Sequence, residues 1–215
     1  MGPGSIDSAV LRAVNHWGLS LPGFDALMVL FSARALGVAF GVVVAGLIAW
    51  RLKRQSVIPL LAMGAAVGLT DRLGAAVLKP FFARVRPCYD SLESAHVRML
   101  VDAANVGSLP SLHAANAFAL AVGATLVWPK LSAFVFPVAT LIALSRVATG
   151  VHWPSDVAFG ALWGGAVALG AWRLAFEVDH RRRRTVTPEP SGQKSAHGGE
   201  AQGALQEAPS DGHDA

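Results

Sequence analysis

The 215-residue sequence is poor in charged residues and nearly devoid of cysteine. Only 15% of its residues are charged, against roughly 25% in soluble globular domains. The single cysteine, Cys88, excludes an intrachain disulfide framework and a metal site built from several thiolates, and we interpret it as a small filler residue. No internal repeat is apparent. These absences argue against a soluble domain, a disulfide-stabilised secreted protein and a repeat protein.

Long apolar segments take the place of the missing charge, since 53% of the residues are hydrophobic. Five segments approach the ~20 residues that a helix needs to cross a bilayer, at 35–50, 57–78, 112–128, 131–147 and 157–176. A shorter apolar stretch at 24–31 either forms a re-entrant piece or extends the first segment, so a sixth crossing stays open. We therefore predict an all-α, polytopic membrane helical bundle with about five to six transmembrane helices.

The segments that flank the predicted spans differ in character. Residues 1–34 are expected to form an N-terminal amphipathic or interfacial segment, because apolar side chains recur there at helical spacing. Those side chains are Ile6, Val10, Ala13, Val14 and Trp17. Residues 35–180 make up the transmembrane domain. Residues 181–215 begin with a basic stop of four arginines and continue as a polar tail, which we expect to be disordered and cytoplasmic because it lacks apolar surface to bury.

The net charge of +4 reflects membrane orientation rather than binding to nucleic acid. Basic residues concentrate at the ends of apolar segments, namely Arg51, Lys53, Arg54, Lys130 and residues 181–184. Alternating crossings put all of them on one side, and the positive-inside rule makes that side cytoplasmic. The bilayer is therefore an expected partner, and no nucleic acid is expected.

Three polar clusters then fall together on the opposite, outer side. They are Lys79 with Arg86-Pro87, then Pro110-Ser111-Leu112-His113, then Ser145-Arg146 with His152 and Asp156. Lysine, arginine and serine side chains bind phosphoryl oxygens, while two histidines and an aspartate supply a nucleophile, an acid and an orienting carboxylate. This combination indicates phosphate chemistry at a bilayer surface.

The order and spacing of these residues carry a resemblance to a known family. The spacings are six residues between Lys79 and Arg86, five between Arg146 and His152, and three between His152 and Asp156. The set resembles the type 2 phosphatidic acid phosphatase family, which shares its site plan with bacterial acid phosphatases and vanadium haloperoxidases. One position departs from the family pattern, because Leu112 stands where a glycine is usual. The resemblance implies a vanadium-haloperoxidase-like catalytic core and makes 35–180 a phosphatase domain.

The resemblance also implies a role for each residue. His152 attacks phosphorus, Asp156 accepts a hydrogen bond from its other ring nitrogen, and His113 protonates the leaving oxygen. The phosphoryl group is held by Lys79, Arg86, Ser111, the amide of Leu112, and Arg146. No metal or other cofactor is implied. Apart from the resemblance, we expect Ser108 as the N-cap of the third span and Pro110 in its first turn, which presents backbone amides to a phosphate.

Four further residues attract interpretation without a motif. Asp71 and Arg72 fall inside the second span, where charge is costly unless it is paired or lines a wet cavity. A structural ion pair or cavity lining and a substrate contact both stay open for them. Arg84 either steers anionic head groups or is solvated. Trp153 is expected to anchor the chain at the membrane interface.

Together with the resemblance, these features predict an integral membrane lipid phosphatase that uses a phosphohistidine and no metal. Undecaprenyl diphosphate is the first-choice substrate, with phosphatidylglycerol phosphate, phosphatidic acid and lipid A as alternatives. A lipid phosphotransferase is a second alternative, and a non-catalytic lipid-binding or transport protein is a third. We expect a multi-pass protein of the bacterial inner membrane, with its site facing the periplasm or cell exterior. The sequence leaves the oligomeric state open.

Overall fold

The computed structural model describes residues 6–104 and 107–186, and the side chains as far as residue 178. Its helices, in chain order, are α1 Ile6–Ser20, α2 Phe24–Ser32, α3 Arg34–Leu52, η1 Lys53–Ser56, α4 Val57–Leu73, η2 Gly74–Leu78, α5 Lys79–Phe82, η3 Pro87–Tyr89, η4 Ser94–His96, α6 Leu112–Val127, η5 Pro129–Leu131, α7 Ser132–Ala148 and α8 Pro154–Val186. No strand occurs within the described ranges. The predicted all-α class is confirmed.

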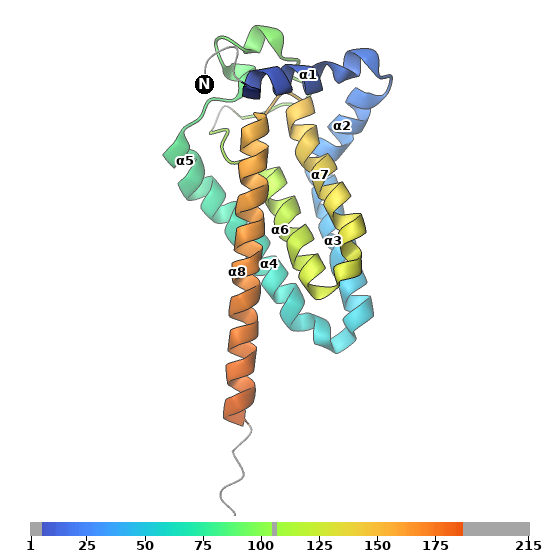
Figure 1. Cartoon of the computed structure of the whole chain (residues 1–215), viewed down its shortest axis with the longest axis vertical. Helices are drawn as coiled ribbons and strands as arrows, with labels where there is room; N and C mark the ends of the chain where they lie inside the picture. The colour runs from blue at the N-terminus through green and yellow to red at the C-terminus, as the bar shows by residue number, and fades with distance from the viewer. Residues whose placement is uncertain (1–5, 105–106, 187–215) are drawn as a thin grey trace, which may run out of the picture. The chain divides into compact units, whose positions relative to one another are not determined.

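Each of the five predicted membrane segments is a helix. Three helical stretches are long and apolar enough to cross a bilayer, Arg34–Phe82, Pro129–Ala148 and Pro154–Val178, and Leu112–Val127 is a shorter apolar helix. The first stretch reverses direction near Lys53, where φ is 51°, so α3 and α4 form a hairpin (Figure 1). The open sixth crossing is not formed, because α2 has only nine residues before the chain turns extended at Ala33.

Small residues let the central helices approach one another closely. A Cβ atom added to Gly164 of α8 would lie 1.9 Å from the carbonyl oxygen of Ala115 in α6, and one on Gly160 would lie 2.6 Å from that of Ser111. In lipid, helices associate through such close backbone approach. The packing fixes the start of α6 against the start of α8, which is where two of the polar clusters lie.

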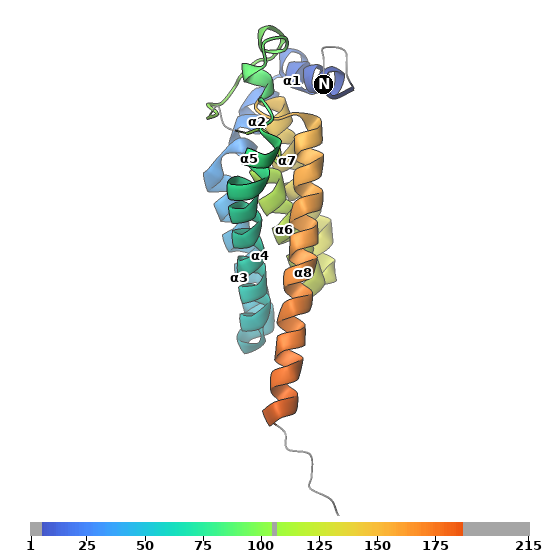
Figure 2. The ribbon, with the colours of Figure 1, turned by 90° about the vertical axis from the view of Figure 1, so that its left-hand side faces the viewer.

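One end of the bundle carries all three polar clusters. Figures 1 and 2 show the α5–α6 loop, the α7–α8 turn and α1 at the same end, and the α3–α4 and α6–α7 turns at the other. Gly150 has a φ of 76° and its N–H donates to the carbonyl of Val147 at 2.9 Å, so the α7–α8 connection is tight. Pro154 begins α8, as its fixed φ suits the first helical position. The alternating topology therefore gathers residues from distant parts of the sequence.

Helix α1 lies across that end of the bundle and packs against it with both apolar and polar side chains. Leu11, Val14 and Asn15 are buried, and Nδ2 of Asn15 donates to the carbonyls of Arg98 and Ala148 at 2.9 and 2.8 Å. Ile6 and Trp17 are exposed, as is Val10, which leaves an apolar face of the kind predicted for an interfacial helix.

The chain divides into two units, 1–179 and 180–215, and the bundle belongs to the first. Of the second unit, the structure describes only the last residues of α8, to Val186. The predicted polar tail from 187 onward lies outside the described residues.

Candidate active site

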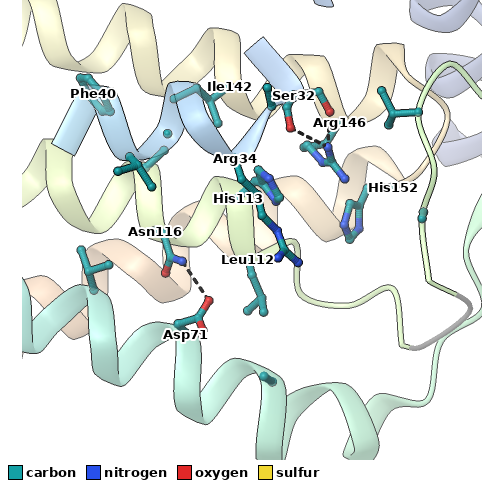
Figure 3. Close-up of a pocket in the computed structure, with 18 of the residues that line it drawn as sticks. Ser32, Arg34, Phe40, Asp71, Leu112, His113, Asn116, Ile142, Arg146 and His152 are labelled. Carbon is teal, nitrogen blue, oxygen red and sulfur yellow. Dashed lines mark hydrogen bonds between the residues drawn. The ribbon is translucent and has the colours of Figure 1, made fainter. Parts of the chain in front are cut away.

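A cavity of about 980 Å³ opens among α3, α4, α6 and α7 at the end of the bundle that carries the polar clusters. Six of the predicted site residues line it: Lys79, Arg86, Leu112, His113, Arg146 and His152. Figure 3 shows His113, Arg146 and His152 on neighbouring elements around this space. The other two, Ser111 and Asp156, are fully buried behind the lining. The structure thus brings together all eight predicted residues.

His152 is held in one orientation from both ring nitrogens. Its Nδ1 lies 3.4 Å from Oδ2 of Asp156, and its Nε2 lies 3.0 Å from Nη1 of Arg86. A guanidinium only donates hydrogen bonds, so Nε2 is the acceptor and the ring proton sits on Nδ1. Burial, opposed by Asp156 and reinforced by Arg86, lowers the pKa of His152 to about 4. The ring is therefore neutral, with a nucleophilic lone pair on Nε2.

Asp156 is fixed by more hydrogen bonds than the sequence indicated. Its Oδ2 accepts from the hydroxyl of Ser108 and from the backbone N–H of Trp153 at 3.0 Å. Its Oδ1 accepts from Nη1 of Arg84 at 2.7 Å. A carboxylate with this many donors keeps its charge and its position, which in turn fixes the tautomer of His152.

Two predictions around this carboxylate are wrong, because α6 begins at Leu112 with Ser111 as its N-cap residue. Ser108 does not cap the third span, and Pro110 lies before the helix rather than in its first turn. The chain between Ser108 and Ser111 turns away from helical geometry, and the Ser108 hydroxyl bonds Asp156 instead. The backbone N–H of Ser111 donates to the carbonyl of Asp156 at 3.1 Å, which joins the second cluster to the third.

Arg84 and Trp153 also differ from expectation. Arg84 is neither solvated nor free to steer head groups, because Nη2 donates to Asp7 at 2.6 Å while Nη1 donates to Ser155 and Asp156. Its guanidinium lies 5.2 Å above the ring of Trp153. Trp153 is only 4% exposed and donates from Nε1 to the carbonyl of Val85 at 2.9 Å, so it is a core residue rather than an interfacial anchor. Arg84 thus bonds the Asp156 carboxylate directly, and the Trp153 ring packs against Arg84.

The cations at the phosphate end are held by backbone carbonyls. Arg86 donates from Nε to Ala104 at 3.0 Å and from Nη1 to Val151 at 2.8 Å, and burial lowers the pKa of its guanidinium. Arg146 donates from Nη1 to the hydroxyl and carbonyl of Ser32. These bonds aim both guanidinium groups into the cavity before any ligand arrives.

Sequence analysis missed a further cation. Arg34 lines the cavity from the start of α3, and Figure 3 shows it beside His113. Its charge lies close enough to interact with His113 and Arg146. The available signal was a lone arginine at the edge of an apolar run, which resembles the flank of any span.

Leu112, the departure from the family pattern, is accommodated by a glycine on another helix. A Cβ atom on Gly74 would lie 2.4 Å from Cδ2 of Leu112, so the leucine side chain occupies the space that Gly74 leaves. Leu112 is the first residue of α6, so its backbone N–H is one of the groups at a helix start that have no partner within the helix.

Asp71 and Arg72, the two charges inside the second span, have different surroundings. Asp71 lines the cavity and accepts a hydrogen bond from Nδ2 of Asn116 at 3.0 Å. Arg72 forms no ion pair with any residue that the structure describes. The expected structural ion pair is therefore wrong for Arg72, and cavity lining is right for Asp71.

Comparison with known proteins places this site in a family. A family model described as the PAP2 superfamily matches residues 55–179. The chain belongs to this superfamily. The lipid A 4'-phosphatase of Bacteroides thetaiotaomicron is 27% identical over 196 residues, which cover 86% of this chain and 83% of that protein.

Two solved structures are also similar. LpxE from Aquifex aeolicus matches with a TM-score of 0.64 and 26% identity, covering 79% of this chain and 96% of that one. A PAP2 type phosphatidylglycerolphosphate phosphatase from Bacillus subtilis matches in fold, with a TM-score of 0.54 and 23% identity over 80% of this chain and 86% of that one. The resemblance to type 2 phosphatidic acid phosphatases is confirmed, and the chain is a membrane lipid phosphatase of that family.

Proposed function

We propose that this PAP2 protein hydrolyses a phosphate ester or diphosphate of a lipid through a phosphohistidine formed on His152. One observation carries the proposal. Nε2 of the buried His152 ring lies 3.0 Å from a guanidinium nitrogen of Arg86, while Nδ1 faces Asp156. The group that binds a phosphoryl oxygen is thus in contact with the atom that attacks phosphorus.

The reaction takes two steps. In the first, the Nε2 lone pair of His152 bonds to phosphorus as the bond from phosphorus to the lipid oxygen breaks, and His113 gives its proton to that oxygen. Asp156 stabilises the positive charge that develops on the His152 ring. In the second, neutral His113 takes a proton from water as the water oxygen attacks phosphorus and the phosphorus–nitrogen bond breaks. Inorganic phosphate leaves, and both histidines return to their starting states.

Positive side chains stabilise the charge on the transferring group in this proposal. Lys79, Arg86 and Arg146 surround the cavity end next to His152. Nε of Arg146 and the hydroxyl of Ser111 are buried and have no hydrogen-bond partner among the described residues. Buried donors normally have partners, so a phosphoryl oxygen is a suitable acceptor for both. No group of three or more His, Cys, Asp or Glu side chains in the described ranges is arranged to hold a metal ion.

Two substrate classes are compatible with this chemistry. Undecaprenyl diphosphate suits a small multi-pass protein whose cavity has apolar walls, including Val38, Phe40 and Leu120. A phosphomonoester of a lipid with a larger head group is supported by the name of the relative, a lipid A 4'-phosphatase. The proposed location is the bacterial inner membrane with the cavity facing outward, because Arg51 and Arg54 lie at the opposite end of the bundle.

The test is phosphate release by the purified full-length protein in detergent containing EDTA, over a panel of polyprenyl and glycerol lipid phosphates and lipid A. We expect metal-independent release from at least one lipid and none from His152→Ala. Recovery of the phosphate on an acceptor lipid rather than in solution would instead identify a phosphotransferase. Neither release nor transfer from any lipid would indicate a non-catalytic protein and end the proposal.

A further inference from the structure

The cavity has a second polar end that the phosphohistidine mechanism does not use. Asp71 of α4 and Asn116 of α6 both line it, and Nδ2 of Asn116 donates to Oδ1 of Asp71 at 3.0 Å. Figure 3 shows this pair on the wall of the cavity away from Arg146 and His152. A carboxylate and an amide therefore face the same space as the phosphate-binding cations.

Helix geometry connects this pair directly to the catalytic residues. Asn116 follows His113 by three residues, so the two side chains lie on one face of α6, about one turn apart. On the other wall, Asp71, Ala75 and Lys79 all line the cavity. The segment Gly74–Leu78 is a π-helix, which has more residues per turn than an α-helix. The wider turn places Lys79 on the same side of the helix as Asp71. A ligand whose phosphate contacts Lys79 and His113 thus extends toward Asp71 and Asn116.

A carboxylate inside a membrane span is energetically unfavourable, so its presence there indicates a function. Asp71 lies within the stretch Arg34–Phe82, and its neighbours on the cavity wall include the apolar Val67 and Ala75. Charged residues inside membrane spans are expensive and mark substrate or ion pathways. No cation is bonded to Asp71 among the described residues. Its hydrogen-bond partner among the described residues is the Asn116 amide, which supplies one hydrogen bond and no charge.

The buried atom without a partner at this pair is an acceptor. One N–H of the Asn116 amide donates to Asp71, while Oδ1 of Asn116 is buried and has no partner in the described part of the chain. The second carboxylate oxygen of Asp71 also only accepts. A ligand that satisfies these acceptors must donate hydrogen bonds, as the hydroxyl and amide groups of a sugar or glycerol head group do. A second phosphate donates none when ionised and is repelled by the carboxylate.

We infer that Asp71 and Asn116 form a head-group subsite that accepts hydrogen bonds from hydroxyl or amide groups next to the scissile phosphate. This inference rests on the proposed function and narrows its substrate class. The enzyme selects phosphomonoesters of hydroxylated lipids over a bare polyprenyl diphosphate. Sugar and glycerol head groups share the required chemistry, and the substrate arms of the test separate them.

The test compares kcat/KM on four substrates for the wild type and two variants, Asp71→Asn and Asn116→Leu. Lipid A and phosphatidylglycerol phosphate carry head-group donors, phosphatidic acid carries none, and undecaprenyl diphosphate adds a second phosphate. Loss of a hydrogen bond to a charged or buried polar group corresponds to about ten- to a hundredfold. Each variant should lower kcat/KM on a donor-bearing substrate by that factor relative to phosphatidic acid. Asp71→Asn should also raise kcat/KM on undecaprenyl diphosphate relative to kcat/KM on phosphatidic acid.

The matched control is Arg72→Gln, which removes a neighbouring charge that does not line the cavity and should leave every ratio unchanged. If the two subsite variants lower kcat/KM on lipid A alone, the head group recognised is a sugar. If they lower kcat/KM on phosphatidylglycerol phosphate alone, it is glycerol. Equal changes on all four substrates, or unchanged ratios, overturn the subsite while leaving the phosphatase proposal intact. A wild type that releases no phosphate from any substrate ends the proposed function and the subsite with it.

Discussion

The two histidines of the site differ sharply in how they are held. His152 is 2% exposed and bonded at both ring nitrogens, and its backbone N–H donates to the carbonyl of Arg146 at 3.1 Å. The imidazole of His113 lines the cavity and makes no hydrogen bond to any described residue. A nucleophile must present one particular lone pair, so its tautomer is fixed in advance. An acid needs only to meet the leaving oxygen, which the substrate itself brings.

One part of the network around His152 comes from outside the region that the family model matches. Asp7 of α1 accepts from Arg84 and from the backbone N–H of Ser155 at 2.9 Å, and Arg84 in turn donates to Asp156. The family match begins at residue 55. Helix α1 thus joins the hydrogen-bond network around the Asp156 carboxylate, a contact that the three motifs alone do not reveal.

The largest expected effect comes from removing His152, the rigidly held histidine. His152→Ala removes the atom that attacks phosphorus, and we expect turnover to fall by about six orders of magnitude, as for nucleophile removal in other covalent enzymes. The measurement is phosphate release in EDTA. His96→Ala, at an exposed histidine between α5 and α6, is the control and should keep full activity. More than a hundredth of wild-type activity in His152→Ala would contradict the assignment.

The second prediction concerns His113, the histidine that faces the cavity without a hydrogen bond to the described residues. His113→Ala removes the proton donor and should lower turnover of lipid phosphates by roughly 10²- to 10⁴-fold. A p-nitrophenyl ester has a leaving group that needs no proton, so its hydrolysis should fall far less. His152→Ala should instead fall equally on both substrates. An identical loss for both esters in His113→Ala would rule out its role as the acid.

The third prediction loosens the His152 side without touching the substrate. Arg84→Gln breaks the bonds to Asp7 and Asp156, and a small misplacement of the nucleophile should lower kcat by about ten- to a hundredfold while KM stays nearly constant. Asp7→Asn should act in the same direction, and the double variant should fall short of the sum because the residues share one network. Lys130→Gln, at the far end of the bundle, is the control. A change in KM alone would argue against positioning.

The smallest effect concerns pH. Because burial lowers the pKa of His152 to about 4, its ring stays neutral between pH 5 and 8. Protonation of His152 should therefore reduce kcat/KM only below about pH 5, and not with a midpoint near the ordinary histidine value of about 6.5. Phosphorus NMR of the substrate alone locates its own ionisation for correction. A residual acid limb with a midpoint near pH 6.5 that persists in His113→Ala would overturn this expectation.

Sequence reasoning succeeded where the signal is local or periodic and failed where it depends on long-range partners. The apolar runs predicted the helices of the five membrane segments, namely α3, α4, α6, α7 and α8. Ser108 was misassigned because a serine before a helix is a good N-cap by propensity. Its actual partner, Asp156, lies 48 residues away in the sequence. The contacts of Arg84 and the burial of Trp153 were not predicted for the same reason, because their partners are also far away in the sequence.

By itself, the sequence determined a polytopic helical bundle, its family, and which residues are candidates for binding and cleaving a phosphate. Those properties follow from composition, period and residue chemistry, which are readable one segment at a time. Only the tertiary structure decided which nitrogen of His152 faces Arg86, that α1 reaches Asp156 through Arg84, and that Asp71 meets Asn116 in the cavity. Hydrogen bonds act over about 3 Å, so they are set by how distant helices pack and not by neighbours in the chain.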